Sequence, residues 1–164
     1  MTQVRPKYAL VQAHFPTPKD VPASKLFELI GHPEKARDPL WHNTCAIRIS
    51  LALICAGMSI PAGLLYIKAS SGVYKQYKGR SLEIKQEALA ALLTREWGEP
   101  DRFGAALMLE RIAGRSGVIR FLNLWGPYDP QGHIDLVAPD QWNRLACQGS
   151  CYQHAVEVWF WELP

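Results

Sequence analysis

Apolar and polar positions along this chain follow two periodicities, that of an α-helix in some segments and that of a β-strand in others. In residues 81–97, leucines recur at helical spacing on one face while Glu, Lys and Gln occupy the other. Ser81 is expected to cap this helix, and Gly98 follows its end. A shorter helix is expected at residues 22–30, with Gly31 stopping it. The first part of the chain is therefore predicted to be helical.

Residues 45–56 form the most apolar stretch of the chain, interrupted only by Arg48 and Ser50. A helix that is apolar nearly all round is a buried one, so this segment is expected to be the central helix of the core. Residues 33–41 before it are expected to be a polar loop, and residues 1–20 an irregular arm.

Three stretches near the C-terminus predict β-strands, at residues 118–125, 133–137 and 155–161. In the last of them, Val and Phe alternate with Glu and Trp, which is the period-two pattern of a strand. Helices followed by strands indicate an α+β fold with an antiparallel sheet. A length of 164 residues suits one domain, spanning residues 1–164.

Composition and charge exclude several classes of partner. The net charge of +3 is small and the Lys and Arg residues look dispersed, so no nucleic-acid partner is expected and only a mild attraction to an anionic polymer is allowed. The longest apolar run, residues 49–56, is too short to span a bilayer, so no membrane insertion is expected. Residues 1–19 lack the pattern of a secretory signal, so a protein of this sequence that acts outside the cytoplasm is expected to leave by a route that needs no cleaved signal peptide.

The candidate chemistry lies where the central helix and the second strand begin. Cys45 opens the helix, and His133 opens the strand. The unpaired N–H groups and the dipole of a helix N-terminus favour a thiolate, and a histidine brought to that sulfur completes a nucleophile and base pair. The Cys45 thiol is expected to face the surface. Cys55 lies ten residues further on, about 15 Å along the helix, and cannot bond to Cys45.

A histidine base is normally oriented by an acceptor on its other ring nitrogen. Asp140, seven residues beyond His133, is the preferred candidate because the chain can turn back after Pro139. Asp135 shares a strand face with His133 and is an alternative. Gln148 or a backbone carbonyl is a further alternative.

Two more cysteines, Cys147 and Cys151, flank a turn-like Gln-Gly-Ser segment. A disulfide closing this small loop is one interpretation, and it would indicate an oxidising compartment. Two free thiols are the second interpretation. A metal site with His154 is the third, but three clustered ligands without a fourth are weak evidence, and no metal is expected.

Four residues are candidates for contacts to a substrate: Trp41, His42, Asn43 and Trp125. Each has a structural alternative. Tryptophans are more often core residues, a loop histidine is more often solvated, and Asn43 is well placed to cap the helix that Cys45 opens.

Several of these motifs together resemble a known family. Residues 43–50, Asn-Thr-Cys-Ala-Ile-Arg-Ile-Ser, look like the cysteine motif of the type VI secretion amidase effectors, fourth family. Residues 132–136, Gly-His-Ile-Asp-Leu, resemble its histidine motif, and the Cys147/Cys151 pair and residues 158–163 resemble its C-terminal region. The resemblance covers roughly residues 40 to 164 as an ordered set of motifs.

This resemblance implies a compact papain-like, NlpC/P60-like fold and a cysteine amidase without a cofactor. It implies an antibacterial toxin that the type VI secretion apparatus delivers, and that acts in the periplasm of target bacteria. The expected reaction is cleavage of the D-glutamyl–meso-diaminopimelate bond of peptidoglycan stem peptides, and the expected partner is a cognate periplasmic immunity protein. In the family the acceptor for the histidine lies near the first cysteine of the small loop, where this chain has no carboxylate.

Other functions remain compatible with the same residues. Cleavage at the diaminopimelate–D-alanine cross-link, a general peptidase and a transglutaminase-like acyl transferase all use the same thiolate chemistry. A non-catalytic wall-binding or partner-binding module of the same fold is the alternative from another class.

Overall fold

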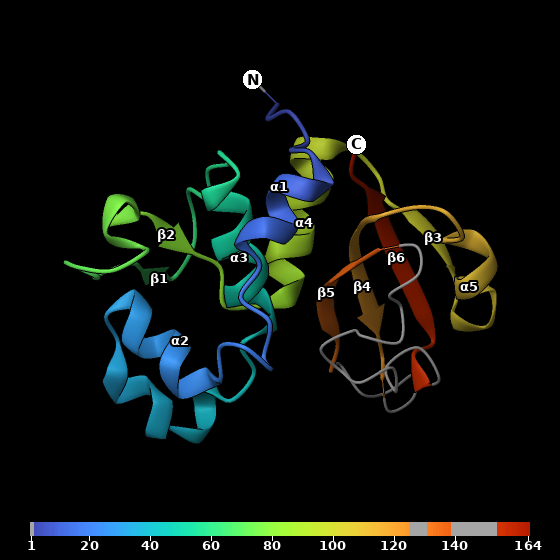
Figure 1. Cartoon of the computed structure of the whole chain (residues 1–164). Helices are drawn as coiled ribbons and strands as arrows, with labels where there is room; N and C mark the ends of the chain where they lie inside the picture. Colours follow the sequence, from blue (N-terminus) through green and yellow to red (C-terminus); the bar gives the residue numbers. More distant parts are fainter. Residues whose placement is uncertain (1, 125–130, 139–153) are drawn as a thin grey trace.

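The chain folds into an N-terminal helical region beside a C-terminal antiparallel sheet (Figure 1). This computed structural model describes residues 2–124, 131–138 and 154–164. The α-helices are α1 Tyr8–His14, α2 Ala23–Ile30, α3 Cys45–Cys55, α4 Gln86–Trp97 and α5 Met108–Arg111. The strands are β1 Leu65–Tyr66, β2 Ser81–Leu82, β3 Asp101–Gly104, β4 Gly117–Leu122, β5 His133–Val137 and β6 Glu157–Glu162. Short 3-10 helices are η1 Pro33–Arg37, η2 Pro39–Trp41, η3 Lys75–Tyr77 and η4 Ala105–Leu107.

Helix α3 is the centre of the helical region, as its apolar sequence predicts. Every residue from Cys45 to Ile54 is buried, and the helix packs against α1, α4 and β5. Its two polar residues are both satisfied in the interior: Ser50 Oγ accepts a hydrogen bond from the backbone N–H of Glu83 at 3.1 Å, and Arg48 makes the contacts described below. A helix buried on all sides gives its first residue a well-defined position.

The larger sheet has the strand order β3-β6-β4-β5, with all pairs antiparallel. Alternate residues of each strand face opposite sides, and both sides carry apolar residues. One side joins the main core with α3 and α4, through Val118, Ile134, Leu136 and Trp161. The other side forms a second core with α5, through Ile119, Phe121, Val137, Val158 and Phe160. β5, at one end of this strand order, lies against α3, and this contact positions the site.

The N-terminal segment contains a helix, so the expectation of an irregular arm over residues 1–20 is wrong. Helix α1 buries Val11 completely and packs against α3. The Tyr8 N–H donates to the carbonyl of Pro164 at 2.8 Å, which joins the two ends of the chain. A seven-residue helix is too short to be stable alone, so docking against the core is what stabilises it.

The expected helix at 81–97 begins later, at Gln86, and Ser81 does not cap it. Ser81 and Leu82 instead form β2, which pairs with β1, and the Ser81 hydroxyl donates to the carbonyl of Ile60. The buried Glu83 carboxylate accepts from the N–H groups of Ile84, at 2.8 Å, and Lys85, at 3.1 Å, just before the helix. A tertiary pairing therefore overrides the local helical pattern.

Smaller differences concern the boundaries of other elements. The strands expected at 118–125 and 155–161 are β4 Gly117–Leu122 and β6 Glu157–Glu162, while β5 has the bounds expected for it. The polar loop at 33–41 holds two 3-10 helices. Strand β3, which pairs with β6, was not expected, because only Phe103 of its four residues is buried and its sequence shows no apolar alternation.

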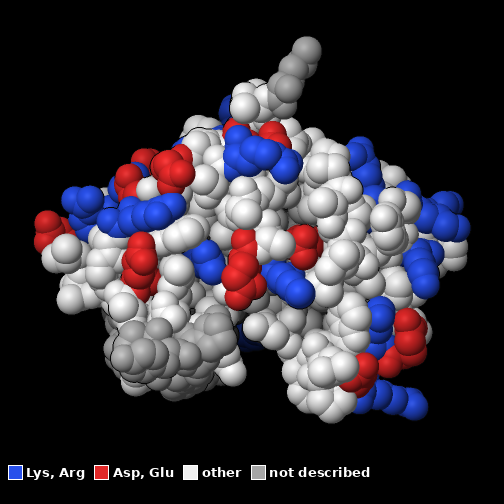
Figure 2. All heavy atoms as spheres, turned by 180° about the vertical axis from the view of Figure 1, so that it is seen from behind, with Lys and Arg blue, Asp and Glu red and all other residues white. Residues whose placement is uncertain are grey.

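Charged side chains of both signs lie on the face of the molecule opposite to that of Figure 1 (Figure 2). Within the described ranges, no helix combines the length and the apolar character that a membrane crossing requires.

Candidate active site

Helix α3 and strand β5 bring Cys45, His133 and Asp135 together. Cys45 is the first residue of α3, and His133 is the first residue of β5. His133 Nε2 lies 3.1 Å from Asp135 Oδ2, and the Cys45 thiol lies near enough to the imidazole to raise its pKa. The three side chains are thus arranged in space as a thiol, then an imidazole, then a carboxylate. This is the arrangement of a nucleophile, a base and the group that orients the base.

The environment of His133 favours its protonated form. Burial by itself would lower the pKa of His133, but the hydrogen bond that its ring N–H donates to Asp135, the interaction with Cys45 and the negative charges of both groups outweigh it. The net effect raises the pKa of His133 to about 10. An imidazolium beside a sulfur is the arrangement that holds a cysteine as its thiolate.

Asp135 is held firmly in its position. Its side chain is buried, and Oδ1 accepts from the N–H of Leu136 at 2.8 Å while Oδ2 faces the imidazole. Tyr8 of α1 lies close enough for the Asp135 charge to act on it. Burial first and that charge second raise the pKa of Tyr8 to about 12, so Tyr8 stays neutral near the carboxylate.

Asn43, the residue expected to cap helix α3, lies one position before the N-cap, which is Thr44 and makes no side-chain capping hydrogen bond. Asn43 Oδ1 accepts from the backbone N–H of Cys45 at 3.2 Å, and the Asn43 side chain is exposed. This hydrogen bond satisfies one of the donors that a helix N-terminus leaves free. Cys45 itself is only 8% exposed, so the expectation of a surface-facing thiol is wrong. Its burial follows from the packing of the whole helix in the core.

Arg48, one turn after Cys45, is a buried charge that sequence reasoning passed over. Its Nε donates to Thr44 Oγ1 at 2.9 Å, and its Nη1 donates to the carbonyls of Pro16, at 2.6 Å, and Val21, at 2.7 Å. The guanidinium therefore ties the segment after α1 to the first turn of α3. Burial lowers the pKa of Arg48, and nearby negative groups, Asp135 and Cys45 among them, act in the opposite direction. A lone cation in an otherwise apolar helix was the signal available in the sequence.

The segment before Cys45 places other candidate residues beside the helix. Trp41 is half-buried and packs edge-on against Phe27 of α2, with ring centroids 6.1 Å apart. Lys35 Nζ lies 3.7 Å from the centre of the Trp41 ring, a cation–π contact. His42 is exposed. Trp41 therefore has a structural role in addition to any contact with a substrate.

Five of the candidates lie outside the described residues: Trp125, Asp140, Cys147, Gln148 and Cys151. The disulfide and metal interpretations of the two cysteines, and the preferred orienting residue Asp140, fall in that part of the chain. Among the described residues, Cys45 is a free thiol and so is Cys55. Asp135, which was the alternative, is the carboxylate that contacts His133.

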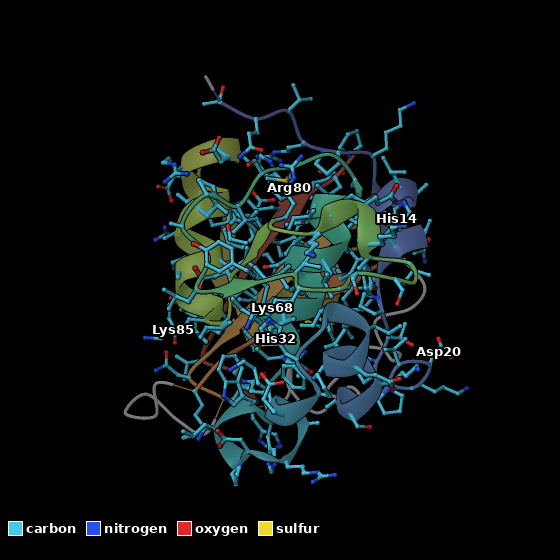
Figure 3. All side chains as sticks on the ribbon, turned by 90° about the vertical axis from the view of Figure 1, so that its left-hand side faces the viewer. His14, Asp20, His32, Lys68, Arg80 and Lys85 are labelled. Atoms are coloured by element: carbon cyan, nitrogen blue, oxygen red, sulfur yellow. The ribbon has the colours of Figure 1, made fainter. Side chains whose placement is uncertain are left out.

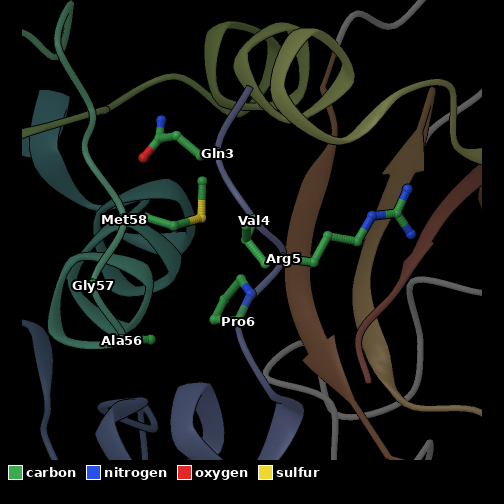
Figure 4. Close-up of a pocket in the computed structure, with 7 residues that line it drawn as sticks. All are labelled: Gln3, Val4, Arg5, Pro6, Ala56, Gly57 and Met58. Carbon is green, nitrogen blue, oxygen red and sulfur yellow. The ribbon is translucent and has the colours of Figure 1, made fainter. Parts of the chain in front are cut away.

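Two other features of the helical region lie apart from this site. A hollow of about 420 Å³ is lined by Gln3, Val4, Arg5, Pro6, Ala56, Gly57 and Met58, at the far end of α3 from Cys45 (Figure 4). His32, labelled in Figure 3, is buried between the carbonyl of Tyr66, 2.6 Å from Nε2, and Glu34 Oε1, 3.2 Å from Nδ1. His32 therefore joins the end of α2 to β1 and has a structural role.

Comparison with known protein families shows which family the chain belongs to. Residues 41–161 match the model of the family described as type VI secretion system (T6SS), amidase effector protein 4. The chain belongs to this family. The matched segment includes the whole of α3 and all of the larger sheet except the last residue of β6, and therefore Cys45, His133 and Asp135.

Solved structures of amidase effector 4 proteins share the fold. The type VI effector Tae4 from Enterobacter cloacae has a TM-score of 0.73 and 22% identity, over 100% of both chains. The Tae4–Tai4 effector–immunity complex from the same organism has a TM-score of 0.73 and 21% identity, and that from Salmonella Typhimurium has 0.70 and 21%. Each of these two covers 98% of this chain and 100% of the other. A search of curated protein sequences finds no significant match.

These findings confirm the resemblance stated from the motifs, and with it the α+β fold with antiparallel sheets. The family is one of amidase effectors of a secretion system, so the chain is an enzyme that hydrolyses amide bonds. The two complexes named above each hold an effector together with an immunity protein.

Proposed function

We propose that the chain is an antibacterial effector that cleaves the D-glutamyl–meso-diaminopimelate amide of peptidoglycan stem peptides. The observation that carries the proposal is the convergence of Cys45, His133 and Asp135 at the contact between α3 and β5, in a chain of the amidase effector family. We infer a papain-like, NlpC/P60-like site from the same arrangement, with the nucleophile on a helix start and the base on a neighbouring strand.

In the proposed reaction, the Cys45 sulfur attacks the carbonyl carbon of the scissile amide. The protonated His133 donates its proton to the leaving amine, and an acyl-enzyme remains on Cys45. Water then attacks the thioester carbonyl, His133 takes a proton from that water, and the glutamyl carboxylate leaves as the thiolate returns. Asp135 holds the imidazole in place throughout and stabilises its charged form.

The oxyanion formed during this attack requires donors close to the Cys45 sulfur. The backbone N–H of Cys45 points from the helix start, where the dipole favours negative charge. In the present state this N–H donates to Asn43 Oδ1 at 3.2 Å, a long hydrogen bond. An oxyanion is a stronger acceptor than an amide oxygen, so the substrate displaces the Asn43 side chain from this donor. Asn43 then lies at the edge of the site, with its amide free to contact the stem peptide.

The partners follow from the same assignment. We propose that the effector leaves the producing cell through the type VI secretion apparatus and acts in the periplasm of a target bacterium. We propose that a cognate immunity protein protects the producer by covering the Cys45 site, and that Cys147 and Cys151 form a disulfide in the oxidising periplasm. Trp41 and His42, just before Cys45, and Trp125 are the proposed contacts of the stem peptide.

The test is digestion of purified Gram-negative sacculi, with the fragments identified by mass. Wild-type protein should release fragments ending at D-glutamate, and Cys45→Ala should release none while its circular dichroism remains native. Fragments cut between diaminopimelate and D-alanine would contradict the proposed bond. Digestion by Cys45→Ala at the wild-type rate would contradict the mechanism.

Toxicity from two compartments provides the second test. The effector fused to a cleavable signal peptide should lyse the cell that expresses it, because peptidoglycan lies in the periplasm. The same chain without the signal should be nearly harmless, and exported Cys45→Ala or His133→Ala should not lyse cells. Equal toxicity from both compartments would contradict the proposed substrate.

A further inference from the structure

The residues between β1 and α4 carry a concentration of positive charge that is not used by the site. Residues 68–85 contain five cations, Lys68, Lys75, Lys78, Arg80 and Lys85, and one acidic residue, Glu83. This segment therefore carries +4, while the whole chain carries +3, so all other residues together carry −1. The cations that look dispersed along the sequence are thus unevenly placed, with the surplus in a single segment.

All five cations are exposed, and within the described part of the chain none of them forms an ion pair. The acidic residue of the segment does not neutralise them, because the Glu83 carboxylate is buried and accepts hydrogen bonds from the backbone at the start of α4. Elsewhere several arginines are paired: Arg95 with Glu96, Arg102 with Glu99, and Arg115 with Asp101 and Glu162. The exposed side chains of the segment itself therefore present a net positive charge to solvent.

The segment is built as a fixed platform. β1 and β2 pair antiparallel, and two further hydrogen bonds extend the pairing, from Gly79 N–H to the Ile67 carbonyl at 2.8 Å and from Ile67 N–H to the Arg80 carbonyl at 2.9 Å. The Lys68 N–H donates to the carbonyl of Ile30 at 2.9 Å, which joins the segment to the end of α2. Charges held on an ordered backbone lose less entropy on binding than charges on a free tail.

The cations lie together on one side of the molecule. Figure 3 looks onto the side that carries β1 and β2, where Lys68, Arg80 and Lys85 are labelled. Figure 2, seen from behind, shows several Lys and Arg side chains along its right-hand edge, with Asp and Glu side chains among them at the lower end; this edge is the left-hand side of Figure 1, where β1 and β2 lie. Strand β1 and the segment that follows it also carry exposed apolar side chains: Tyr66 is 54% exposed and Val73 is 66% exposed.

We propose that this face, the basic platform of residues 65–85, docks the enzyme onto the peptidoglycan sacculus through the free carboxylates of the stem peptides. The proposal rests on the proposed substrate and adds a second contact to it, separate from the Cys45 site. Peptidoglycan repeats carboxylates along its glycan strands, and its sugars also offer faces to an exposed tyrosine. A polymer with this repeat suits several cations held at fixed positions, because each contact raises the effective concentration for the next.

Binding to insoluble sacculi tests the proposal without catalysis. In a Cys45→Ala background, Lys75, Lys78 and Arg80 are changed together to Gln, and binding is measured by sedimentation with purified sacculi at 25 and 150 mM salt. The expected result is a loss of affinity of about tenfold or more at the lower salt, and a weaker salt dependence than that of the parent. The matched control changes Lys7, Lys19 and Lys25, three exposed lysines outside the platform, to Gln and should bind like the parent.

Two further measurements test whether the carboxylates of peptidoglycan are what the basic platform binds. Sacculi whose carboxylates have been amidated chemically should bind the parent as weakly as native sacculi bind the triple variant. Equal binding of the parent to native and amidated sacculi would overturn the proposal, as would binding of the triple variant at the parent's affinity. Tighter binding of the parent to double-stranded DNA or to anionic lipid vesicles than to sacculi would overturn the choice of peptidoglycan as the occupant.

A soluble substrate separates this proposal from the proposed function. With Cys45 intact, the triple variant should hydrolyse small soluble muropeptides at the wild-type rate and digest intact sacculi several-fold more slowly. If the wild type hydrolyses neither substrate, the proposed function fails. The sedimentation result alone then decides whether the platform binds sacculi. If the triple variant digests sacculi at the wild-type rate, the platform has no role in docking.

Discussion

Arg48 offers a direct test of how packing around helix α3 holds its first turn, where Cys45 lies. Replacing it with Met keeps most of the apolar stem and removes the guanidinium. Three hydrogen bonds are lost, to Thr44 Oγ1 and to the carbonyls of Pro16 and Val21, at 2.9, 2.6 and 2.7 Å. Arg48 is only 3% exposed, so water cannot easily replace the guanidinium as donor.

The expected loss of stability in Arg48→Met can be worked out from these contacts. A hydrogen bond to a charged group contributes about 1.5–3 kcal/mol, but the three bonds share one cation and removal of that cation also ends its desolvation cost. We therefore expect the free energy of unfolding to fall by about 3–5 kcal/mol, less than the simple sum. For a chain of this length such a loss lowers Tm by roughly 10 °C.

The assay is urea unfolding followed by the fluorescence of the six tryptophans. Arg48→Lys keeps the charge but loses the planar fork, and should recover about half of the loss. Arg95→Met is the matched surface control, because Arg95 is 61% exposed in its pair with Glu96, and it should cost less than about 1 kcal/mol. An Arg48→Met protein within about 1 kcal/mol of the wild type would refute the view that this arginine holds the N-terminal segment onto α3.

The remaining predictions concern the proposed site. Alkylation of Cys45 by iodoacetamide at neutral pH should be faster in the wild type than in His133→Ala, because the raised pKa of His133 keeps an imidazolium beside the sulfur; equal rates would argue against the pair. The alkaline loss of activity, where His133 gives up its proton, should move to lower pH in Asp135→Asn, since a group that raises the His133 pKa is removed; an unmoved limb would contradict this contact. The stabilisation from the raised His133 pKa is fully present below about pH 6.5 and lost as pH rises toward 10, so urea unfolding should show the wild type losing stability relative to His133→Ala over that interval, and parallel curves would count against it. If Cys147 and Cys151 are bonded, protein from the periplasm should weigh about 2 Da less before reduction than after; an unchanged mass would exclude the bridge.

Local patterns in the sequence were enough to find the two ends of the site. Helix α3 and strand β5 begin at the residues expected, Cys45 and His133, because an almost wholly apolar run and a short alternating run each have one low-energy local structure. The motif around Cys45 and the motif around His133 also led to the family that the comparison confirms. These properties depend on residues close together in the chain.

Other features were decided only by tertiary packing. The choice of Asp135 as the contact of His133 depends on how β5 lies against α3, and the strand pattern alone left Asp140 preferred. Ser81, which suits a helix cap, forms a strand because Leu82 has a place in the core opposite Leu65. Helix α1 exists because the core offers Val11 a buried position.

The physical reason is the range of the interactions. Helical and extended periodicity depend on residues that are neighbours in the chain, so the sequence by itself determined that Cys45 and His133, the proposed nucleophile and base, begin their helix and strand. Cys45 and His133 are 88 residues apart, and Arg48 takes its acceptors from a segment that precedes it by about 30 residues. Contacts of this kind form only when separate elements pack, and only the tertiary structure could decide which charges meet in the core and which, like those of the basic platform, are left facing solvent.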